Sequence, residues 1–263
     1  LVGHYLLLLS TYFFYKAIVE KGLRQPLELL FRDLQQAVHS RDEFISIAAH
    51  ELKTPLTPLR LQLQNFQRLL RMGRAAELSP EKVDRTILIS IKQIDRMTYL
   101  IDSLMDATRI SLGKLEVSKA PFDLAALVRE VADRHSPELQ AARNELTFDL
   151  SEGCTFNGDA ARLDQVISNL LLNASKYAPG SQVSIGLKHT EGNLLWVEDN
   201  GPGIPAEARG RIFGRYERLN QEHRSGGLGL GLFISRQIVE AHGGTLRLAS
   251  KPGTGCRFEI RLP

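Results

Sequence analysis

Apolar residues recur every three or four positions along the first half of the chain, which is the spacing of one face of an α-helix. One such pattern covers residues 27–71 and a second covers residues 80–110. Gly73 ends the first pattern, Ser79 suits the N-cap of the second, and Gly113 ends it. The pattern therefore predicts two long antiparallel helices joined by a short turn. A lone hairpin leaves its apolar stripe uncovered, so we expect two copies to form a homodimer with a four-helix bundle.

From Pro121 onward, short helical patterns alternate with strand-like segments. Helices are predicted at about 123–143, 159–177 and 228–241. The predicted strands are ELTFDL, QVSIGLKH, NLLWVED, TLRLAS and CRFEIRL. This order predicts a two-layer α/β sandwich with a mixed sheet, and the whole chain is therefore expected to be α+β.

The first fifteen residues, LVGHYLLLLSTYFFY, are mostly apolar and are followed by Lys16, Lys21 and Arg24. Two interpretations compete: the end of a truncated transmembrane helix, or the core of a signal peptide. A signal peptide normally has a basic stretch before its core and small residues after it, and neither is present. We therefore favour a truncated membrane span over residues 1–19, with a juxtamembrane helix over 20–40. The basic residues after the span predict that the rest of the chain lies in the cytoplasm.

Charge and cysteine content exclude several classes of function. The formal net charge is +3 over 263 residues, and the basic residues are scattered among acidic ones, so nothing indicates a nucleic-acid partner. Cys154 and Cys256 are far apart, without the C-x-x-C spacing or the histidine pair of a zinc site. Two reduced thiols are the expectation.

His50 lies within FISIAAHELKTPLTPLRLQLQ, residues 44–64 of the first predicted helix. It falls nearly opposite the apolar stripe, and Thr54 lies one turn later on the same face, so we expect an exposed imidazole. An exposed histidine alone is usually a solvated side chain. Pro55 changes that estimate, because a proline inside a helix removes a backbone hydrogen bond and costs about 3 kcal/mol. Such a defect beside a histidine and a carboxylate, Glu51, indicates a local function.

Two motifs in the second half carry groups suited to an anionic ligand and its metal. In NLLLNASKYAP, Asn169 and Asn173 lie four positions apart on one helix face, and amide oxygens are suitable ligands for Mg²⁺. A lysine one turn on, Lys176, can meet a phosphate. In VEDNGPGIP, the glycines after Asp199 permit tight turns and close approach of a flat ligand. A polar helix face and a surface hairpin are the structural alternatives for these two motifs.

A third motif, GGLGLGLFISRQIVEAHGG, places Gly227, Gly229 and Gly231 directly before a predicted helix. Backbone N–H groups at a helix N-terminus suit a polyphosphate. Alternate glycines weaken a helix, and a purely structural segment would have no reason to carry them.

HELKTPLTPLR closely resembles the phospho-acceptor segment of bacterial sensor histidine kinases. The three later motifs resemble, in order, the N, G1 and G2 boxes of the ATP-binding domain shared by histidine kinases, type II topoisomerases, Hsp90 chaperones and MutL proteins. RIFGRYERL resembles the kinase F box, with Phe213 and Tyr216 at its aromatic positions. The resemblance covers about residues 40–263. It implies a HisKA-type dimerisation and phosphotransfer domain over 41–113 and a GHKL-type catalytic domain of Bergerat fold over 114–263.

The resemblance implies that His50 attacks the γ-phosphate of ATP, that Glu51 is the general base, and that Thr54 helps to position water. It also implies that Asn173 holds Mg²⁺ and that Asp199 accepts a hydrogen bond from the adenine amino group. The other implied nucleotide-binding residues are Asn169, Lys176, Tyr177, Gly201, Gly203, Phe213, Tyr216, Arg218, Gly227, Gly229 and Gly231, with Arg215 and Arg218 reaching the phosphates from a lid. The lid departs from the family pattern at Gly214, where an acid is common, and at Leu228, where a small hydroxyl residue is usual.

The expected function is therefore ATP-dependent autophosphorylation of His50 in a membrane-bound homodimer of the bacterial inner membrane. The phosphoryl group would pass to an aspartate in the receiver domain of a response regulator, and the protein would also hydrolyse the regulator's phosphate. A mechanical ATPase of the topoisomerase or chaperone type is the second class, but such proteins lack the hairpin with the exposed histidine. A non-catalytic scaffold or phosphatase-dominant relative is the third, and the presence of His50, Glu51, Asn173 and Asp199 argues against a dead kinase.

Overall fold

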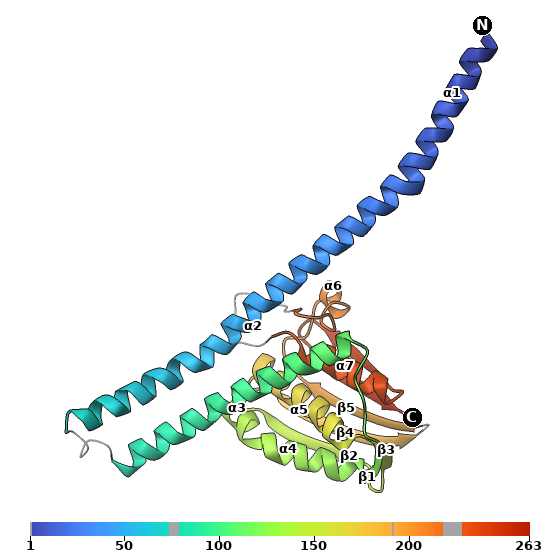
Figure 1. The fold of residues 1–263 in the computed structure, drawn as a ribbon. Coiled ribbons are helices and arrows are strands. Elements are labelled where there is room, and N and C mark those ends of the chain that lie inside the picture. Colours follow the sequence, from blue (N-terminus) through green and yellow to red (C-terminus); the bar gives the residue numbers. More distant parts are fainter. Residues whose placement is uncertain (1, 74–78, 191, 218–227) are drawn as a thin grey trace. The chain divides into compact units, whose positions relative to one another are not determined.

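The computed structural model describes residues 2–73, 79–190, 192–217 and 228–263, and the chain divides into two units, residues 1–53 and 54–263 (Figure 1). The first unit is helical throughout its described residues. It contains α1 (Val2–Lys16), a π-helix η1 (Ala17–Arg24) and the first part of α2 (Gln25–Arg71). No helix in the described part of the chain is both long enough and apolar enough to cross a membrane. The membrane span over residues 1–19 stays a prediction.

The π-helix lies immediately before Pro26, and this position accounts for it. A proline ring collides with the carbonyl group four residues back, which here belongs to Gly22. In the structure the N–H of Gln25 donates to the carbonyl of Glu20, five residues back. The wider turn is the i→i+5 pattern of a π-helix, which lets the helix continue into α2 instead of breaking.

The second unit begins within α2 and continues through α3 (Pro80–Ser111). Both helix bounds agree with those predicted. The Ser79 hydroxyl caps α3 by accepting from the N–H of Lys82 at 3.4 Å, and Pro80 occupies its first turn. Gly73 and Gly113 end the two helices with φ values of 67° and 65°, because a left-handed residue after the last turn favours glycine.

Residues 114–263 form helices over one face of a mixed sheet, as predicted (Figure 1). The five-stranded sheet has the order β2-β4-β5-β7-β6, in which β2 and β4 are parallel and all other neighbours are antiparallel. A separate antiparallel pair joins β1 to β3. The bounds are β1 Ala120–Asp123, α4 Leu124–Ala141, β2 Glu145–Leu150, β3 Thr155–Gly158, α5 Ala160–Tyr177, β4 Gln182–Thr190, β5 Gly192–Asp199, α6 Ala206–Arg209, α7 Gly231–Ala241, β6 Thr245–Lys251 and β7 Gly255–Leu262.

The core lies between this sheet and helices α4, α5 and α7. Alternate residues of the central strands are fully buried, as the period of two in a strand requires. The buried strand residues include Val183, Ile185, Leu187, Leu195, Val197 and Ile260, and the facing helices contribute Val128, Val131, Leu163, Ile167, Leu170 and Ile238.

Trp196 of β5 is paired with Gly186 of β4 in the strand register, and its indole ring lies over this glycine. A Cβ atom at Gly186 would lie 1.9 Å from the indole ring, so the ring requires a glycine beneath it. The ring is flanked by two cations: Lys188 Nζ lies 5.4 Å from its centroid, and Arg257 Cζ lies 4.6 Å away. The side chains of this lysine and arginine help to cover Trp196, which is only 5% exposed.

Gly186→Ala tests this packing, because the methyl group would displace the Trp196 ring. We expect the free energy of unfolding to fall by about 1–3 kcal/mol, which is the usual cost of overpacking. Denaturant unfolding followed by tryptophan fluorescence measures it. Gly210→Ala is the matched control, since a Cβ atom there meets nothing within 4 Å and its φ of −73° suits any residue. Equal stability of the two variants would contradict this account of Gly186.

Candidate functional site

His50 is exposed, as predicted: its side chain is 80% accessible on α2. The next residue, Glu51, is buried at 5% exposure. Glu51 Oε1 lies 4.0 Å from His50 Nδ1, which is within ion-pair range but too long for a hydrogen bond. The imidazole is therefore accessible to a reactant, while a buried carboxylate lies near its Nδ1 atom.

Thr54 is exposed on the same helix, and α2 runs through Pro55 and Pro58 without ending. Pro55 itself is buried. Burial of the proline ring gives this residue a packing role and agrees with its place on the apolar face of the predicted helix.

The two asparagines of α5 lie in different environments. Asn169 is buried, and its Nδ2 atom donates to Ser235 Oγ of α7 at 2.9 Å. Asn173, one turn later, is half-buried. Lys176 is also half-buried, with its Nζ atom 4.8 Å from the ring centroid of Tyr177, which is exposed. Asn169 therefore joins two helices, whereas Asn173 and Lys176 remain accessible at the end of α5.

Asp199 ends β5 with a buried carboxylate, 8% exposed. Its Oδ1 atom accepts from the N–H of Gly201 at 2.9 Å, and the backbone of Cys256 also donates to it. Burial raises the pKa of Asp199 above its usual range, while the two backbone donors act in the opposite direction. Among the described residues, no cation forms an ion pair with this carboxylate. A buried carboxylate without such a partner is a candidate binding group.

The described glycines of the second and third motifs, Gly201, Gly203, Gly229 and Gly231, each have a packing reason. A Cβ atom at Gly201 would lie 2.4 Å from Ala178 Cβ, and one at Gly203 would lie 2.1 Å from the Lys251 carbonyl oxygen. Gly203 also has a φ of 72°. These contacts bring the loop after β5 against the end of α5 and against β6.

In the third motif, a Cβ atom at Gly229 would lie 2.8 Å from the backbone of Tyr216, and its φ is 65°. One at Gly231 would lie 2.1 Å from Asn169 Oδ1. The expectation that a structural segment has no reason for these glycines was therefore wrong. Close contacts with Tyr216 and Asn169 are a structural reason for glycine at these two positions, and the second contact brings the start of α7 against α5.

The aromatic motif before the glycines is held by ring contacts. Phe213 packs edge-on against Phe258, with centroids 6.5 Å apart, and Arg215 stacks over Phe233 at 4.7 Å. Tyr216 has a left-handed backbone, with φ 63°, and its N–H donates to the carbonyl of Gly229 at 3.0 Å. Arg218 and Gly227 lie outside the described residues.

Sequence reasoning missed three residues that shape this region: Ser235, Ala178 and Cys256. Ser235 is 1% exposed and anchors Asn169. Ala178 lies against Gly201, and the Cys256 backbone donates to Asp199. A small residue such as Ser or Ala in an apolar run gives little signal by itself, and a backbone donor gives none.

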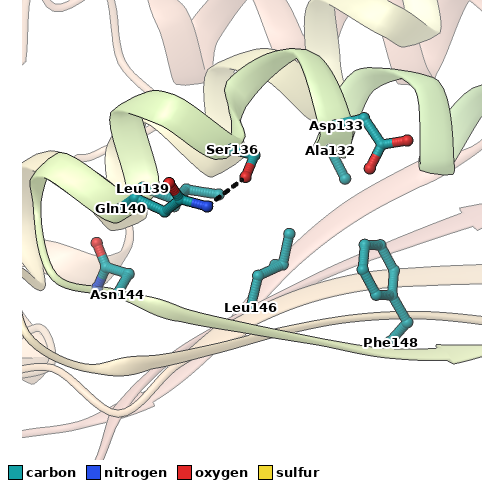
Figure 2. A pocket seen from close by; sticks show the side chains of 8 residues that line it. All are labelled: Ala132, Asp133, Ser136, Leu139, Gln140, Asn144, Leu146 and Phe148. Atoms are coloured by element: carbon teal, nitrogen blue, oxygen red, sulfur yellow. Dashed lines mark hydrogen bonds between the residues drawn. The ribbon is translucent and has the colours of Figure 1, made fainter.

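A pocket of about 270 Å³ lies elsewhere, between α4 and β2 (Figure 2). Its lining contains none of the predicted site residues. Asn144 lies at one end, where its Nδ2 atom donates to the carbonyls of Ala178 and Ser181. Its buried Oδ1 atom has no hydrogen-bond partner among the residues that the structure describes. Asn144 thus ties the turn after α4 to the turn after α5. The other lining residues are Ala132, Asp133, Ser136, Leu139, Gln140, Leu146 and Phe148.

The polar groups near Asp199 suit a nucleotide, and they limit how many protein ligands a metal ion could have there. The described residues contain no cluster of three or more His, Cys, Asp or Glu side chains able to hold an ion. Mg²⁺ often takes one or two protein ligands and completes its shell with phosphates and water. The accessible amide of Asn173 suits such a role, whereas a site made only of protein ligands does not fit these residues.

Comparisons with known proteins identify both halves of the chain. Residues 40–113 match the family described as His Kinase A (phospho-acceptor) domain. Residues 158–263 match the family described as histidine kinase-, DNA gyrase B-, and HSP90-like ATPase.

Full-length relatives are similar across most of the chain. The sensor protein SrrB of Staphylococcus aureus is 29% identical over 253 residues, which cover 93% of this chain and 42% of SrrB. The adaptive-response sensory kinase SasA of Thermosynechococcus vestitus is 33% identical, covering 92% of this chain and 63% of SasA. The chain thus spans less than two thirds of each.

Two solved structures share the fold. The Acinetobacter baumannii histidine kinase AdeS has a TM-score of 0.60 and 25% identity, covering 81% of this chain and 96% of that one. Full-length ShkA, solved in complex with AMPPNP, has a TM-score of 0.60 and 26% identity, covering 84% of this chain and 45% of that one.

Asp199→Asn tests whether the buried carboxylate is kept at the expense of stability. Because the folded-state pKa is raised, the wild-type protein gains stability from protonation at acid pH and loses it as the pH rises through that pKa. The asparagine keeps an acceptor for Gly201 without the charge. We expect its free energy of unfolding to exceed that of the wild type at pH 7.5, with a difference that shrinks as the pH falls toward 3.8.

Urea unfolding at several pH values measures this difference, and Asp149→Asn, at an exposed carboxylate of β2, is the control. A less stable Asp199→Asn protein at pH 7.5, or a difference that does not vary with pH, would contradict the assignment.

Proposed function

Because the chain belongs to the bacterial sensor histidine kinases, we propose that it transfers the γ-phosphoryl group of ATP to His50. We propose that the group then passes to an aspartate in the receiver domain of a response regulator. The exposure of His50 beside the buried Glu51 carries this proposal. An acceptor buried within the helices would be out of reach of both the nucleotide and the regulator.

In the proposed reaction, Nε2 of neutral His50 attacks the γ-phosphorus. A P–N bond forms, the bond to the bridging oxygen breaks, and ADP leaves with the electron pair. Nδ1 carries the ring's proton, and Glu51 Oε1 lies 4.0 Å from it. A small movement of either side chain would make a hydrogen bond that holds this tautomer and stabilises the positive charge developing on the ring.

We assign the nucleotide site to the end of β5, the end of α5 and the start of α7. Asp199 would accept a hydrogen bond from the adenine amino group, since its carboxylate has spare acceptor capacity beyond its two backbone donors. Asn173 would hold Mg²⁺, whose charge offsets that of the phosphates. Lys176 would meet a phosphate, and the backbone N–H groups at the start of α7 would meet others.

The finer parts of the proposal follow from the family. Thr54, exposed on α2, would help to position the water that hydrolyses the regulator's phosphate. The domains would be a dimerisation and phosphotransfer domain over residues 41–113 and a catalytic domain over 114–263. The apolar run before Lys16, followed by basic residues, supports attachment to the bacterial inner membrane, with the juxtamembrane helix over 20–40 leading to catalytic domains in the cytoplasm.

His50→Gln tests the acceptor directly. Incubation of the wild-type protein with ATP labelled at the γ-phosphate should give a label that is labile in acid and stable in base, as a phosphoramidate is. We expect the label to vanish in His50→Gln, because glutamine has no nucleophilic ring nitrogen. The control is His189→Gln, which alters an exposed histidine of β4 bonded to Asn193. Label retained in His50→Gln, or lost in His189→Gln, would remove His50 from this role.

Asp199→Asn also tests the adenine contact. The substitution replaces one carboxylate oxygen with an N–H donor, so a charge-assisted hydrogen bond is lost. We expect ATP to bind at least about tenfold more weakly, the usual cost of a hydrogen bond to a charged group. Fluorescent ATP analogue titration measures the affinity, and Asp149→Asn serves as the control. Wild-type affinity in a folded Asp199→Asn protein would refute the adenine assignment.

A further inference from the structure

A charged network joins the long helix α3 to the first two turns of α5. Asp106 of α3 is 5% exposed, and its Oδ2 atom accepts from Arg162 Nη1 and from Gln165 Nε2, both at 2.8 Å. Arg162 Nη1 also donates to Gln165 Oε1 at 3.0 Å. The three side chains thus form a closed set in which each one contacts the other two.

The residues of α3 that share a face with Asp106 are also buried. Leu100, Ser103 and Ala107 are buried, at the three- and four-residue spacing of one helix face that includes Asp106. Residues on other faces of this stretch, such as Ile101 and Met105, remain about half exposed. Since α3 packs against α7, the end of α3 is covered by the two helices that border the proposed nucleotide site.

The covalent connection reaches the same place. Residues 112–119 link α3 to β1, and the N–H of Ser118 donates to Asp159 Oδ2 at 2.9 Å. Asp159 is the N-cap of α5, where its Oδ1 atom accepts from the N–H of Arg162. The linker and the ion pair therefore attach α3 to the N-cap and the first turn of α5. Two attachments at one helix end restrict rotation of residues 114–263 about α3 more than the linker alone would.

A buried ion pair favours one geometry over others. Apolar contacts such as those of Leu100 and Ala107 tolerate sliding. Two charges that have lost their water are stabilised only when they pair with each other, so the ion pair does not tolerate it. When the contact separates, both charges regain water, so the docked arrangement is selective and also reversible. Reversibility matters because His50 would meet the nucleotide first and the response regulator afterwards.

We propose that Asp106, Arg162 and Gln165 are positioning residues that set how the catalytic domain docks on α3. Through this orientation they govern the rate at which bound ATP reaches the acceptor histidine. The proposal rests on the proposed kinase function for its effect on rate, while the docking contact itself is independent of it. These residues touch neither the nucleotide nor the imidazole in this role.

The test uses the intact chain with Asp106→Asn, Arg162→Gln and the double variant. Hydrogen exchange of residues 100–107 reports docking, histidine labelling at saturating ATP reports the rate, and titration of an ATP analogue reports affinity. Arg134→Gln is the matched control, because Arg134 forms an Arg–Asp pair with Asp164 within the same domain, joining α4 to α5 instead of α3 to α5.

We expect both single variants to exchange faster over residues 100–107 and to change the labelling rate in the same direction, by at least about threefold. Affinity for the analogue should stay within about twofold. The labelling rate of the double variant should differ from that of the wild type by less than the product of the two single effects, because no buried charge is left unpaired. The Arg134→Gln protein should match the wild type in all three measurements.

Exchange and labelling unchanged in the single variants would overturn the proposal, as would additive effects in the double variant. A rate change accompanied by an equal loss of affinity would also overturn it, because the residues would then act through the nucleotide site. If the wild-type protein acquires no label, the kinase function fails by itself. Unaltered exchange in the variants would then still reject the docking contact.

Discussion

One aspartate at the start of α5 holds together three separate segments, and the geometry of the catalytic half depends on it. Asp159 accepts from the N–H of Arg162 to cap α5 and from the N–H of Ser118 to hold the linker. Its own N–H donates to Nε2 of His242, whose Nδ1 lies 2.8 Å from the carbonyl oxygen of Ile238 in α7. A buried imidazole that accepts at Nε2 and donates at Nδ1 is a neutral ring with a single tautomer. The linker, α5 and α7 are thereby fixed relative to one another.

This arrangement explains why the glycines near the proposed nucleotide site are required. Since α5 and α7 are held close, Asn169 lies where a side chain at Gly231 would collide with it, and Ala178 lies where one at Gly201 would. The glycines therefore allow segments of the same chain to approach one another closely. The distinctive chemistry of the region lies instead in Asp199, a buried carboxylate whose pKa is raised by the loss of water around it. A protein gains nothing in stability from such a group, which is why it indicates binding.

Much of the fold followed from the sequence, because its signals are local. Ser79 and Gly113 fixed the ends of α3, and period-two alternation located the strands of the five-stranded sheet. Strands β1 and β3 were missed, since four residues are too few to show a period and their pairing joins distant segments. The same limit applies to the site. The spacing of Asn169 and Asn173 predicted one helix face correctly, but only the packing of α7 shows that Ser235 engages the first amide.

The proposed acceptor histidine, His50, shows how helix geometry can give two neighbouring residues of one site opposite environments. Consecutive residues of an α-helix point about 100° apart, so one of two neighbours can face solvent while the other is buried. In the proposed reaction His50 would have to be exposed, because it would meet a nucleotide and then a second protein. The carboxylate proposed to assist it would act more strongly away from water, where charge interactions are less screened. The order His-Glu on α2 satisfies both conditions at once: an accessible ring nitrogen, and a buried Glu51 within 4.0 Å of the other one.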